Sequence, residues 1–343
     1  MRGKQGKLIA KDGRGELALL QRIRRQANRP ATGELRLGIG DDCALLRLKP
    51  GEEMAVTTDL SIAGRHFHLE WHPPEAIGHR TLARGLSDIA AMGARPVAAF
   101  LSLGLPRELT VARGRSPSWA DRFLAGFLAL ADVYQTPLAG GDLAESSLAV
   151  ADIVLLGAVP QRKALLRSGA QPGDLLYVTG ALGGSAAGLA LLRECGAPVS
   201  RAAVHAPKAD NPLAPHLWPQ PRIAQGLWLR RNRALTAAID LSDGLSTDLD
   251  HLCAESGVTA VIDAAALPLH PGATLEQALH GGEDYELLFT ARPNVVLPRG
   301  IAGVAVTQIG TIARRRSGQP SVVLIDESGL RRPLLPGGWQ HFF

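Results

Sequence analysis

The fold hypothesis starts from residues 237–251, which read AAIDLSDGLSTDLDH. An apolar run, a glycine-containing turn and a helical pattern follow one another. The stretch therefore predicts a strand that ends at Asp240 and a helix that begins near Leu245. Four aspartates lie in it, while no Lys or Arg occurs from Ala234 to Ala291. The negative charge of these acids must be compensated by arginines from elsewhere in the fold, by water or by a metal ion.

Length and composition indicate two ordinary domains of the α/β class. The chain has 343 residues, 46% of them hydrophobic but only 4% aromatic, with 38 glycines and 23 prolines. Such a chain is long enough to bury two cores. The many glycines and prolines predict frequent tight turns.

The positive charge is concentrated at the N-terminus. The whole chain carries +5, but residues 1–36 alone carry +7 and the remaining 307 residues carry −2. We therefore expect residues 1–14 to form a basic flexible arm and expect no nucleic-acid partner. RNA or DNA contact through this arm is the minor alternative.

Three isolated cysteines, Cys43, Cys195 and Cys253, show no spacing for zinc or for a disulfide framework. The sequence also has no apolar signal segment and no apolar run of membrane-spanning length. These observations predict a reduced, cytoplasmic protein without a membrane partner.

Hydrophobic periodicity predicts alternating helices and strands. We expect helices near 15–26, 75–92, 118–133, 185–194 and 245–256, with apolar strands between them. Residues 160–173 are polar and rich in turn formers, which is typical of a hinge. We therefore divide the chain into a domain at 15–160 and an α/β domain at 161–343.

Aspartates recur beside glycine or at strand ends, where α/β folds place ligand sites. They are Asp41, Asp42, Asp59, Asp142, Asp240 and Asp243. Short carboxylates at such turns can reach a shared point, and hard oxygen ligands suit Mg²⁺ with phosphate.

Each of these signals also has a plainer interpretation. Asp243 fits an N-cap of the following helix, and Asp88 fits an ion pair with Arg84 one turn earlier. Asp248 and Asp250 are predicted to lie on the solvated face of their helix, and His66 fits an ordinary surface loop.

Two glycine-rich stretches resemble phosphate-binding loops without completing either nucleotide fingerprint. GALGGSAAG at 180–188 lacks the Lys of a Walker loop, and GIGDDC at 38–43 has cysteine where the third glycine should stand. A phosphate cradle at a helix N-terminus and a plain capping turn remain equally open for 180–188.

An ordered series of motifs over residues 15–343 resembles the thiamine-monophosphate kinase family. The series is GIGDDCALL, TTDLSIAGRHF, LARGLSDIAAMGARP, LAGGD, LLRSGAQPGD, VTGALGGSAAGL, AIDLSDGL and GGEDYELLFT. The resemblance implies a two-domain synthetase-like α/β (α+β) fold. Its N-terminal sheet would pair with its twin in a homodimer barrel, beside a C-terminal α/β domain and an ATP cleft.

The resemblance also implies roles for individual residues. The implied Mg²⁺ positions are Asp42, Thr57, Thr58, Asp59, Asp88, Asp142, Asp240 and Asp243. The implied ATP contacts are Gly141, Asp142, Arg167 and Ser242. The implied thiamine phosphate contacts are His66, Glu283 and Trp339. No residue is expected to form a covalent intermediate.

The implied reaction is direct, Mg²⁺-assisted transfer of a phosphoryl group from ATP to thiamine phosphate, giving thiamine diphosphate. Two positions depart from the family pattern, because Leu143 follows GGD and Gly184 replaces an acid. The alternatives are a non-catalytic homologue that binds thiamine phosphate or nucleotide, and another ATP-using synthetase of the same superfamily.

Overall fold

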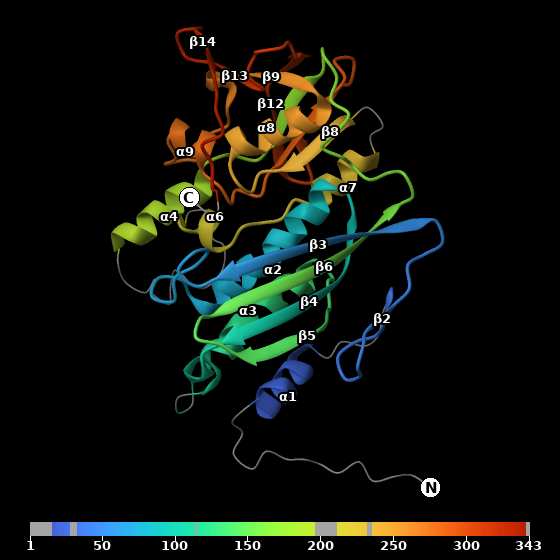
Figure 1. Ribbon diagram of the computed structural model, residues 1–343, viewed down its shortest axis with the longest axis vertical. Helices are drawn as coiled ribbons and strands as arrows, with labels where there is room; N and C mark the ends of the chain where they lie inside the picture. Colours follow the sequence, from blue (N-terminus) through green and yellow to red (C-terminus); the bar gives the residue numbers. More distant parts are fainter. Residues whose placement is uncertain are drawn as a thin grey trace.

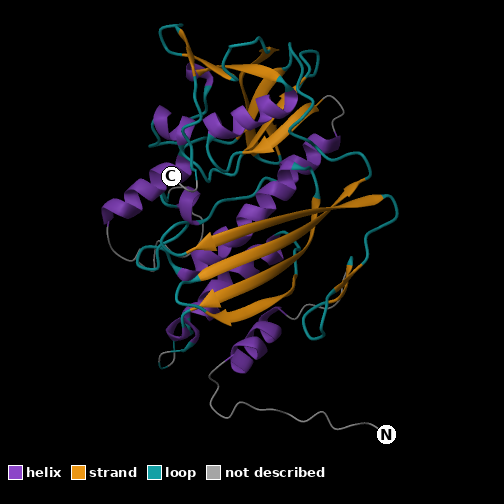
Figure 2. Ribbon diagram, in the orientation of Figure 1, coloured by secondary structure: helices purple, strands orange, loops and turns teal. Residues whose placement is uncertain are grey.

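The computed structural model describes residues 16–27, 33–112, 114, 116–195, 211–231 and 235–340. They form two sheets with helices packed around them, one from each half of the chain (Figures 1 and 2). The mixed α/β, two-sheet architecture expected from the sequence is confirmed. The basic arm expected at residues 1–14 lies outside the described residues.

The N-terminal domain is built on a four-stranded sheet in the order β3-β6-β4-β5. Strand β6 pairs antiparallel with β3 and β4, while β4 and β5 are parallel. A small hairpin of β1 and β2 lies outside this sheet. The elements are α1 (Glu16–Ala27), β1 (Leu35–Leu37), β2 (Leu45–Leu46), β3 (Glu52–Ile62), α2 (Pro74–Ala91), β4 (Arg95–Leu105), a 3-10 turn (Arg107–Thr110), α3 (Trp119–Val133), β5 (Leu138–Glu145) and β6 (Val150–Pro160).

The C-terminal domain is built on an eight-stranded sheet with the path β14-β13-β9-β12-β7-β10-β8 and β11 beside β12. Its elements are β7 (Leu175–Thr179), α4 (Gly184–Cys195), α6 (Ala214–Leu217), α7 (Ile223–Arg231), β8 (Leu235–Asp240), α8 (Leu245–Ser256), β9 (Val258–Asp263), a 3-10 turn (Ala264–Ala266), α9 (Leu275–His280), β10 (Leu287–Ala291), β11 (Gly300–Ile301), β12 (Val304–Arg314), β13 (Val322–Ile325) and β14 (Arg331–Pro333).

Helix α2 lies at the centre of the molecule, between the N-terminal sheet and the C-terminal domain (Figure 1). It contacts α3, β3 and β6 on one side and α7 and β8 on the other. Leu82, Leu86 and Ile89 are fully buried and share one core cluster with Leu287 and Phe289 of the C-terminal sheet. The helix is buried on nearly all sides, although His79, Arg80, Thr81 and Ser87 are among its buried residues. Buried polar groups of this kind need partners, which the two domains supply.

Glycines allow α2 to approach its neighbours at backbone distance. A Cβ on Gly126 of α3 would meet the carbonyl oxygen of Glu75 at 1.9 Å, and one on Gly78 would meet that of Phe123 at 1.9 Å. On the other side, a Cβ on Gly226 of α7 would lie 2.0 Å from the carbonyl oxygen of Ala90. These three contacts leave no room for any side chain.

The predicted elements agree closely with the structure, with a few omissions. The helix predicted at 245–256 has those bounds as α8, and the helix predicted at 75–92 is α2. Strand β5 was not predicted, because Gly140 and Gly141 interrupt its apolar pattern. It forms an edge strand along β4 instead. Strands β12 to β14 were also missed.

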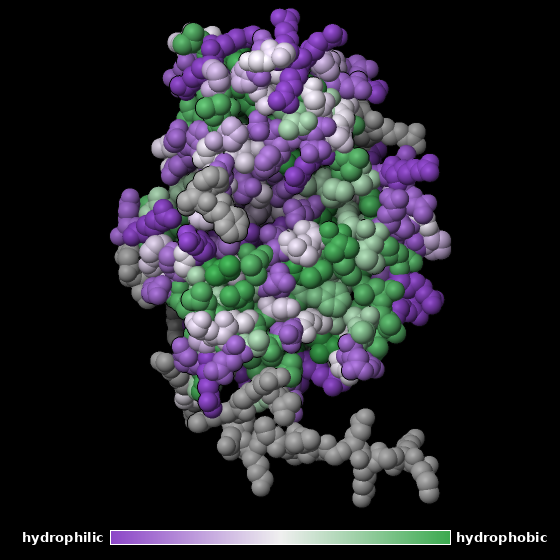
Figure 3. Space-filling model, in the orientation of Figure 1, coloured by the Kyte–Doolittle hydropathy of each residue, from purple (hydrophilic) through white to green (hydrophobic). Residues whose placement is uncertain are grey.

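The four-stranded sheet has one face that none of the helices in the described ranges covers. Met54, Val56 and Leu60 of β3 point to this face and are 46%, 59% and 46% exposed. Figure 3 shows hydrophobic surface gathered over the sheet in this view. Among the described helices, none is both long and apolar enough to span a membrane.

Candidate active site

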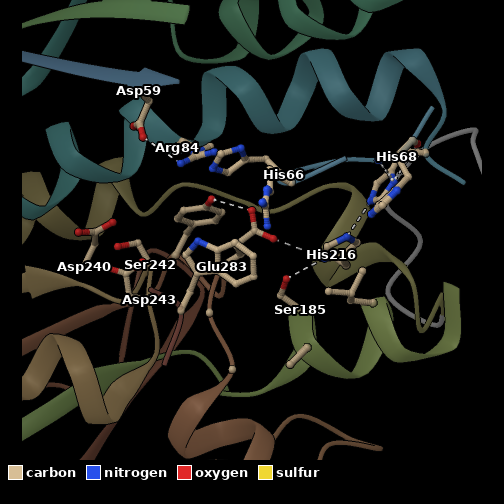
Figure 4. A pocket seen from close by; sticks show the side chains of 18 of the residues that line it. Asp59, His66, His68, Arg84, Ser185, His216, Asp240, Ser242, Asp243 and Glu283 are labelled. Carbon is tan, nitrogen blue, oxygen red and sulfur yellow. Dashed lines mark hydrogen bonds and ion pairs between the residues drawn. The ribbon is translucent and has the colours of Figure 1, made fainter. Parts of the chain in front are cut away.

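A pocket of about 450 Å³ lies where α2 and the loop after β3 meet the C-terminal domain. Its two ends differ in chemistry. Figure 4 shows Asp59, Asp240 and Asp243 toward one end, His68, His216 and Ser185 toward the other, and Glu283 between them. We refer to these as the acidic end and the histidine end.

Four aspartates line the acidic end, two from each domain. Asp59 lies on β3 and Asp88 on α2, while Asp240 ends β8 and Asp243 follows it in the turn. Thr57 Oγ1 donates to Asp88 Oδ2 at 2.5 Å, and Ser87 Oγ donates to Asp240 Oδ2 at 2.6 Å. The structure therefore brings together carboxylates that are up to 184 positions apart in the sequence.

Asp59, Asp88 and Asp240 resist ionisation. Burial, reinforced by repulsion from Asp88, raises the pKa of Asp240 to about 7. Burial raises the pKa of Asp59 to about 6, although Arg84 opposes the shift, and burial also raises the pKa of Asp88. A cation at this end would relieve the repulsion and favour the charged forms.

Two arginines neutralise part of this charge. Arg84 Nη2 lies 3.2 Å from Asp59 Oδ1, so its ion-pair partner is Asp59 and not Asp88, as the helical spacing had suggested. Burial raises the pKa of Asp88 and of Asp240, and the positive charge of Arg167 opposes that rise, so this predicted ATP contact lies near the acidic end.

The turn after β8 is held by Asp248, not by Asp243. Helix α8 begins after Gly244 with no side-chain cap, so the N-cap interpretation of Asp243 is wrong. The amides of Ser242, Asp243 and Gly244 all donate to Asp248 Oδ2 at 3.0 Å. Asp248 is 2% exposed, which also overturns its expected place on a solvated face. Its carboxylate fixes the turn that presents Ser242 and Asp243 to the pocket.

Glu283 connects the two ends through a strained loop. Its φ of 67° lies in the left-handed region, as does the 52° of Tyr285. Such strain in non-glycine residues is often retained at functional sites. The amide of Glu283 donates to Ser242 O at 2.8 Å, and its carboxylate receives Arg80 Nη2 at 2.8 and 2.6 Å. Although burial opposes ionisation, the charges of Arg80 and Arg84 keep the pKa of Glu283 below its usual value.

The histidine end is built by residues that the sequence did not single out. His72, His216, Arg80 and Ser185 are all buried there. Burial lowers the pKa of His72 to about 3 and that of His216 well below its usual value. Both rings are therefore neutral at physiological pH.

The other two predicted substrate contacts also line this pocket. His66 lies in the loop after β3, and its Nδ1 accepts the amide of Ile62 at 3.1 Å. Trp339 is 45% exposed, and its amide donates to Asp243 O at 3.0 Å. A Cβ on Gly338 would lie 2.0 Å from the same carbonyl oxygen, so the C-terminal segment requires glycine at that position.

A second pocket, of about 430 Å³, contains the remaining N-terminal candidates. Asp42, Gly141 and Asp142 line it together with Leu143, between α1, the GIGDDC loop and β5. Thr58 reaches neither pocket with its side chain, because side chains alternate along a strand and Thr58 faces away from Thr57 and Asp59. Within one chain the predicted metal positions are therefore divided between two places.

No three His, Cys, Asp or Glu side chains in the described parts of the chain are arranged to hold a metal ion by themselves. The acidic end nevertheless has the chemistry of a magnesium–phosphate site, since its donors are hard oxygens with excess negative charge. Such sites keep water and phosphate oxygens among their ligands.

The 180–188 loop does not offer its helix N-terminus to a phosphate. The amides of Gly183 and Ser185 donate to Asp284 at 2.6 and 3.1 Å. Glycine in place of the family's acid at position 184 has a steric explanation, because a Cβ there would lie 2.9 Å from the ring of His270 and 3.0 Å from Pro215. The capping interpretation of this loop is therefore the correct one for these two amides.

The sequence carried one signal for the missed residue Arg80. Arg80, Arg84 and Asp88 recur every four residues in a helix that is otherwise rich in alanine and leucine. This spacing forms one polar stripe on a buried helix. His216 gave no such signal, since its contact His72 lies 144 residues away in the sequence.

Comparison with known proteins is consistent with this geometry. The family model for the N-terminal domain of AIR synthase related protein matches residues 40–160, and that for the C-terminal domain matches residues 171–320. Residues from both matched regions line the pocket, together with Trp339 from the C-terminal segment. The fold and site thus define an AIR synthase-related protein.

Individual relatives narrow the class. Thiamine-monophosphate kinase of Escherichia coli (strain K12) is 40% identical over 304 residues, covering 86% of this chain and 87% of its own. The crystal structure of thiamine-monophosphate kinase from Stenotrophomonas maltophilia K279a has 36% identity and a TM-score of 0.74, covering 91% and 96%. A structure of AaThiL complexed with AMPPCP and TMP has 30% identity and a TM-score of 0.71, covering 96% and 97%. The chain belongs to the thiamine-monophosphate kinase family.

The role of Asp248 can be tested against its neighbour Asp250. Asp248→Ala leaves three amides without their acceptor, so we expect a loss of roughly 1–3 kcal/mol in stability, together with reduced turnover. Asp250→Ala removes a half-buried carboxylate of the same helix that makes no such contact, and should change stability by at most about 0.5 kcal/mol. Thermal melting and activity assays on both variants check this. Equal effects of the two substitutions would contradict it.

Proposed function

We propose that this chain transfers the γ-phosphoryl group of ATP to thiamine phosphate, giving thiamine diphosphate and ADP. The observation that carries the proposal is one pocket with an acidic end for the phosphates and a neutral histidine end for the organic group. The relatives with this reaction in their name support it, as does the relative complexed with AMPPCP, an ATP analogue, and TMP, thiamine monophosphate.

In this proposal Glu283 and Trp339 bind the cationic thiazolium ring. Glu283 is kept ionised by Arg80 and Arg84, and Trp339 offers an aromatic face. Both features favour a cation. His66 lies beside them in the same pocket. The acceptor is already an anionic phosphate oxygen, so positioning and charge compensation suffice without a strong general base.

We infer that Mg²⁺ is the cofactor and that Asp59, Asp88, Asp240 and Asp243 hold it at the acidic end. The other proposed positions are Asp42, Thr57, Thr58 and Asp142. When bound, Mg²⁺ offsets charge on the transferring phosphoryl group. Proposed ATP contacts are Gly141, Asp142, Arg167 and Ser242.

A homodimer would account for the uncovered face of the N-terminal sheet. Met54, Val56 and Leu60 form an exposed apolar stripe on the edge strand β3, which is typical of an interaction surface. We further propose domain boundaries at 15–160 and 161–343, supported by the family matches at 40–160 and 171–320. The cytoplasmic location stays a prediction.

The dimer is tested by Val56→Asp. A charge in an apolar interface should shift the mass measured by light scattering from two chains to one. Val296→Asp, at an apolar residue 94% exposed and outside this sheet, is the control and should leave the mass unchanged. A wild-type protein of single-chain mass at micromolar concentration would refute the dimer.

Activity is tested with purified protein, Mg–ATP and thiamine phosphate, with product analysis. Asp243→Asn removes one charge from the acidic end, and we expect turnover to fall on the order of 100-fold with a higher Mg²⁺ requirement. Asp250→Asn, on the helix α8 that follows the turn, is the charge-matched control. Binding of both ligands without turnover by the wild type would favour the non-catalytic homologue. A fully active Asp243→Asn protein would remove Asp243 from the metal set.

Metal binding should also appear in the pH dependence of stability. The pKa of Asp240, about 7, lies above its usual 3.8, so its ionisation destabilises the metal-free fold as pH rises from about 4 through 7. Mg²⁺ binds the ionised form. The rise in melting temperature on adding Mg²⁺ should therefore be larger at pH 8 than at pH 5.5. At 100 times Kd, the gain in the free energy of unfolding at pH 8 should approach about 2.7 kcal/mol.

Thermal melts at matched ionic strength check this difference, with Asp240→Asn as the variant that should lose most of it. An Mg²⁺ effect that is the same at both pH values, in wild type and variant alike, would contradict the assignment.

A further inference from the structure

His216 of α6 lies at the centre of a buried hydrogen-bond network at the histidine end (Figure 4). Its Nε2 is 3.0 Å from Arg80 Nη1 and 3.0 Å from His72 Nε2. Its Nδ1 is 3.0 Å from Ser185 Oγ. Both ring nitrogens are thus engaged, and the positions of the hydrogens follow from the partners.

The ring of His216 carries a single hydrogen. The residue is 2% exposed, and burial together with the charge of Arg80 keeps its pKa well below the usual value. A neutral imidazole has one N–H donor and one bare nitrogen that accepts. Only the choice between the two nitrogens remains.

Arg80 decides which nitrogen carries the hydrogen. A guanidinium group donates and never accepts, so His216 Nε2 must be the bare nitrogen and Nδ1 must carry the hydrogen. The tautomer of His72 follows from this assignment. Because His216 Nε2 is bare, the hydrogen between the two rings belongs to His72 Nε2, 3.0 Å away. His72 Nδ1 is then bare and accepts the amide of His68 at 3.1 Å, and it donates nothing to the His68 carbonyl oxygen 3.2 Å away.

The orientation of the Ser185 hydroxyl follows. His216 Nδ1–H donates to Ser185 Oγ, because the other nearby acceptor, Glu283 Oε2, is 3.8 Å away and too distant for a hydrogen bond. Ser185 Oγ has no further side-chain hydrogen bond within the described ranges of the chain. The residue lines the pocket, so its own hydrogen is available to a ligand there.

We propose that Ser185 is a specificity-determining residue that donates one hydrogen bond to a ring nitrogen of the substrate's aminopyrimidine. Arg80 and His216 act as positioning residues for this hydroxyl. The inference rests on the proposed function. Within the organic part of thiamine phosphate, the two pyrimidine ring nitrogens are the neutral acceptors, since the thiazolium nitrogen has no free lone pair. The phosphate is assigned to the acidic end.

The first test is kinetic. Ser185→Ala should raise KM for thiamine phosphate roughly 3- to 10-fold, the range for one neutral hydrogen bond, with little change in kcat or in KM for ATP. Ser118→Ala removes another buried hydroxyl, which caps α3 away from the pocket, and should leave all three constants unchanged. An unchanged KM in Ser185→Ala would overturn the proposal.

Substrate analogues identify the acceptor. Two thiamine phosphate analogues, each with one pyrimidine ring nitrogen replaced by CH, are compared in wild type and in Ser185→Ala. For one analogue the loss in kcat/KM seen with wild type should disappear in the variant. If both analogues keep their full loss in the variant, Ser185 donates to neither nitrogen and the proposal fails.

The network itself is tested by NMR of ¹⁵N-histidine protein between pH 5 and 9. His216 should show the neutral Nδ1–H form throughout, and the double variant Arg80→Met, His72→Phe, which removes both donors to Nε2, should allow the Nε2–H form to appear. A wild-type Nε2–H form would overturn the proposal whatever the kinetics. Wild-type protein that lacks turnover of thiamine phosphate refutes the proposed function instead, so the two failures are distinguishable.

Discussion

The arrangement of the pocket depends on the ion pair between the buried Arg80 and the half-buried Glu283. Arg80 belongs to the central helix of the N-terminal domain and Glu283 to a strained loop of the C-terminal domain. Removing Glu283 would leave the charge of Arg80 buried without its carboxylate, which typically costs about 3–5 kcal/mol. The same guanidinium contacts His216 and the carbonyl oxygen of His66. One side chain thereby fixes the relation of the two domains, the charge of Glu283 and the hydrogens of the histidine end.

The acidic block between residues 234 and 291 obtains its compensation from several sources. Glu283 and Glu286 pair with Arg80 and Arg222, which come from outside the block. Asp248 and Asp284 accept backbone amides instead. Asp240 and Asp243 are the acids of the block that face the acidic end of the pocket. Most of the block therefore serves structure, and only a small part is left for a ligand.

Local patterns in the sequence were sufficient for most of the elements, with β5 and β12 to β14 as exceptions, and for selecting the aspartates that line the acidic end. The run from Ala237 to Leu252 predicts β8, the turn and α8, because strand and helix periodicities change sharply at Asp240. Asp248 was misassigned because helical spacing places it opposite the leucines, while the turn before α8 folds over it. The histidine end could not be predicted, since His72 and His216 meet only after the two domains pack. No local pattern encodes such a contact.

The glycine contacts around α2 have a consequence for ligand binding. Backbone touches backbone at Gly126 and at Gly226, so α2 cannot slide or tilt against α3 or α7 without overlap of atoms. The helix presents Arg84 and Asp88 to the pocket and Arg80 to Glu283 beside it, and their spacing is set before any ligand arrives. Preorganisation of this kind means that little conformational entropy is lost along α2 when a ligand binds. Adjustment to the ligand is left to the loop after β3 and to the exposed side chain of Trp339, which line the same pocket.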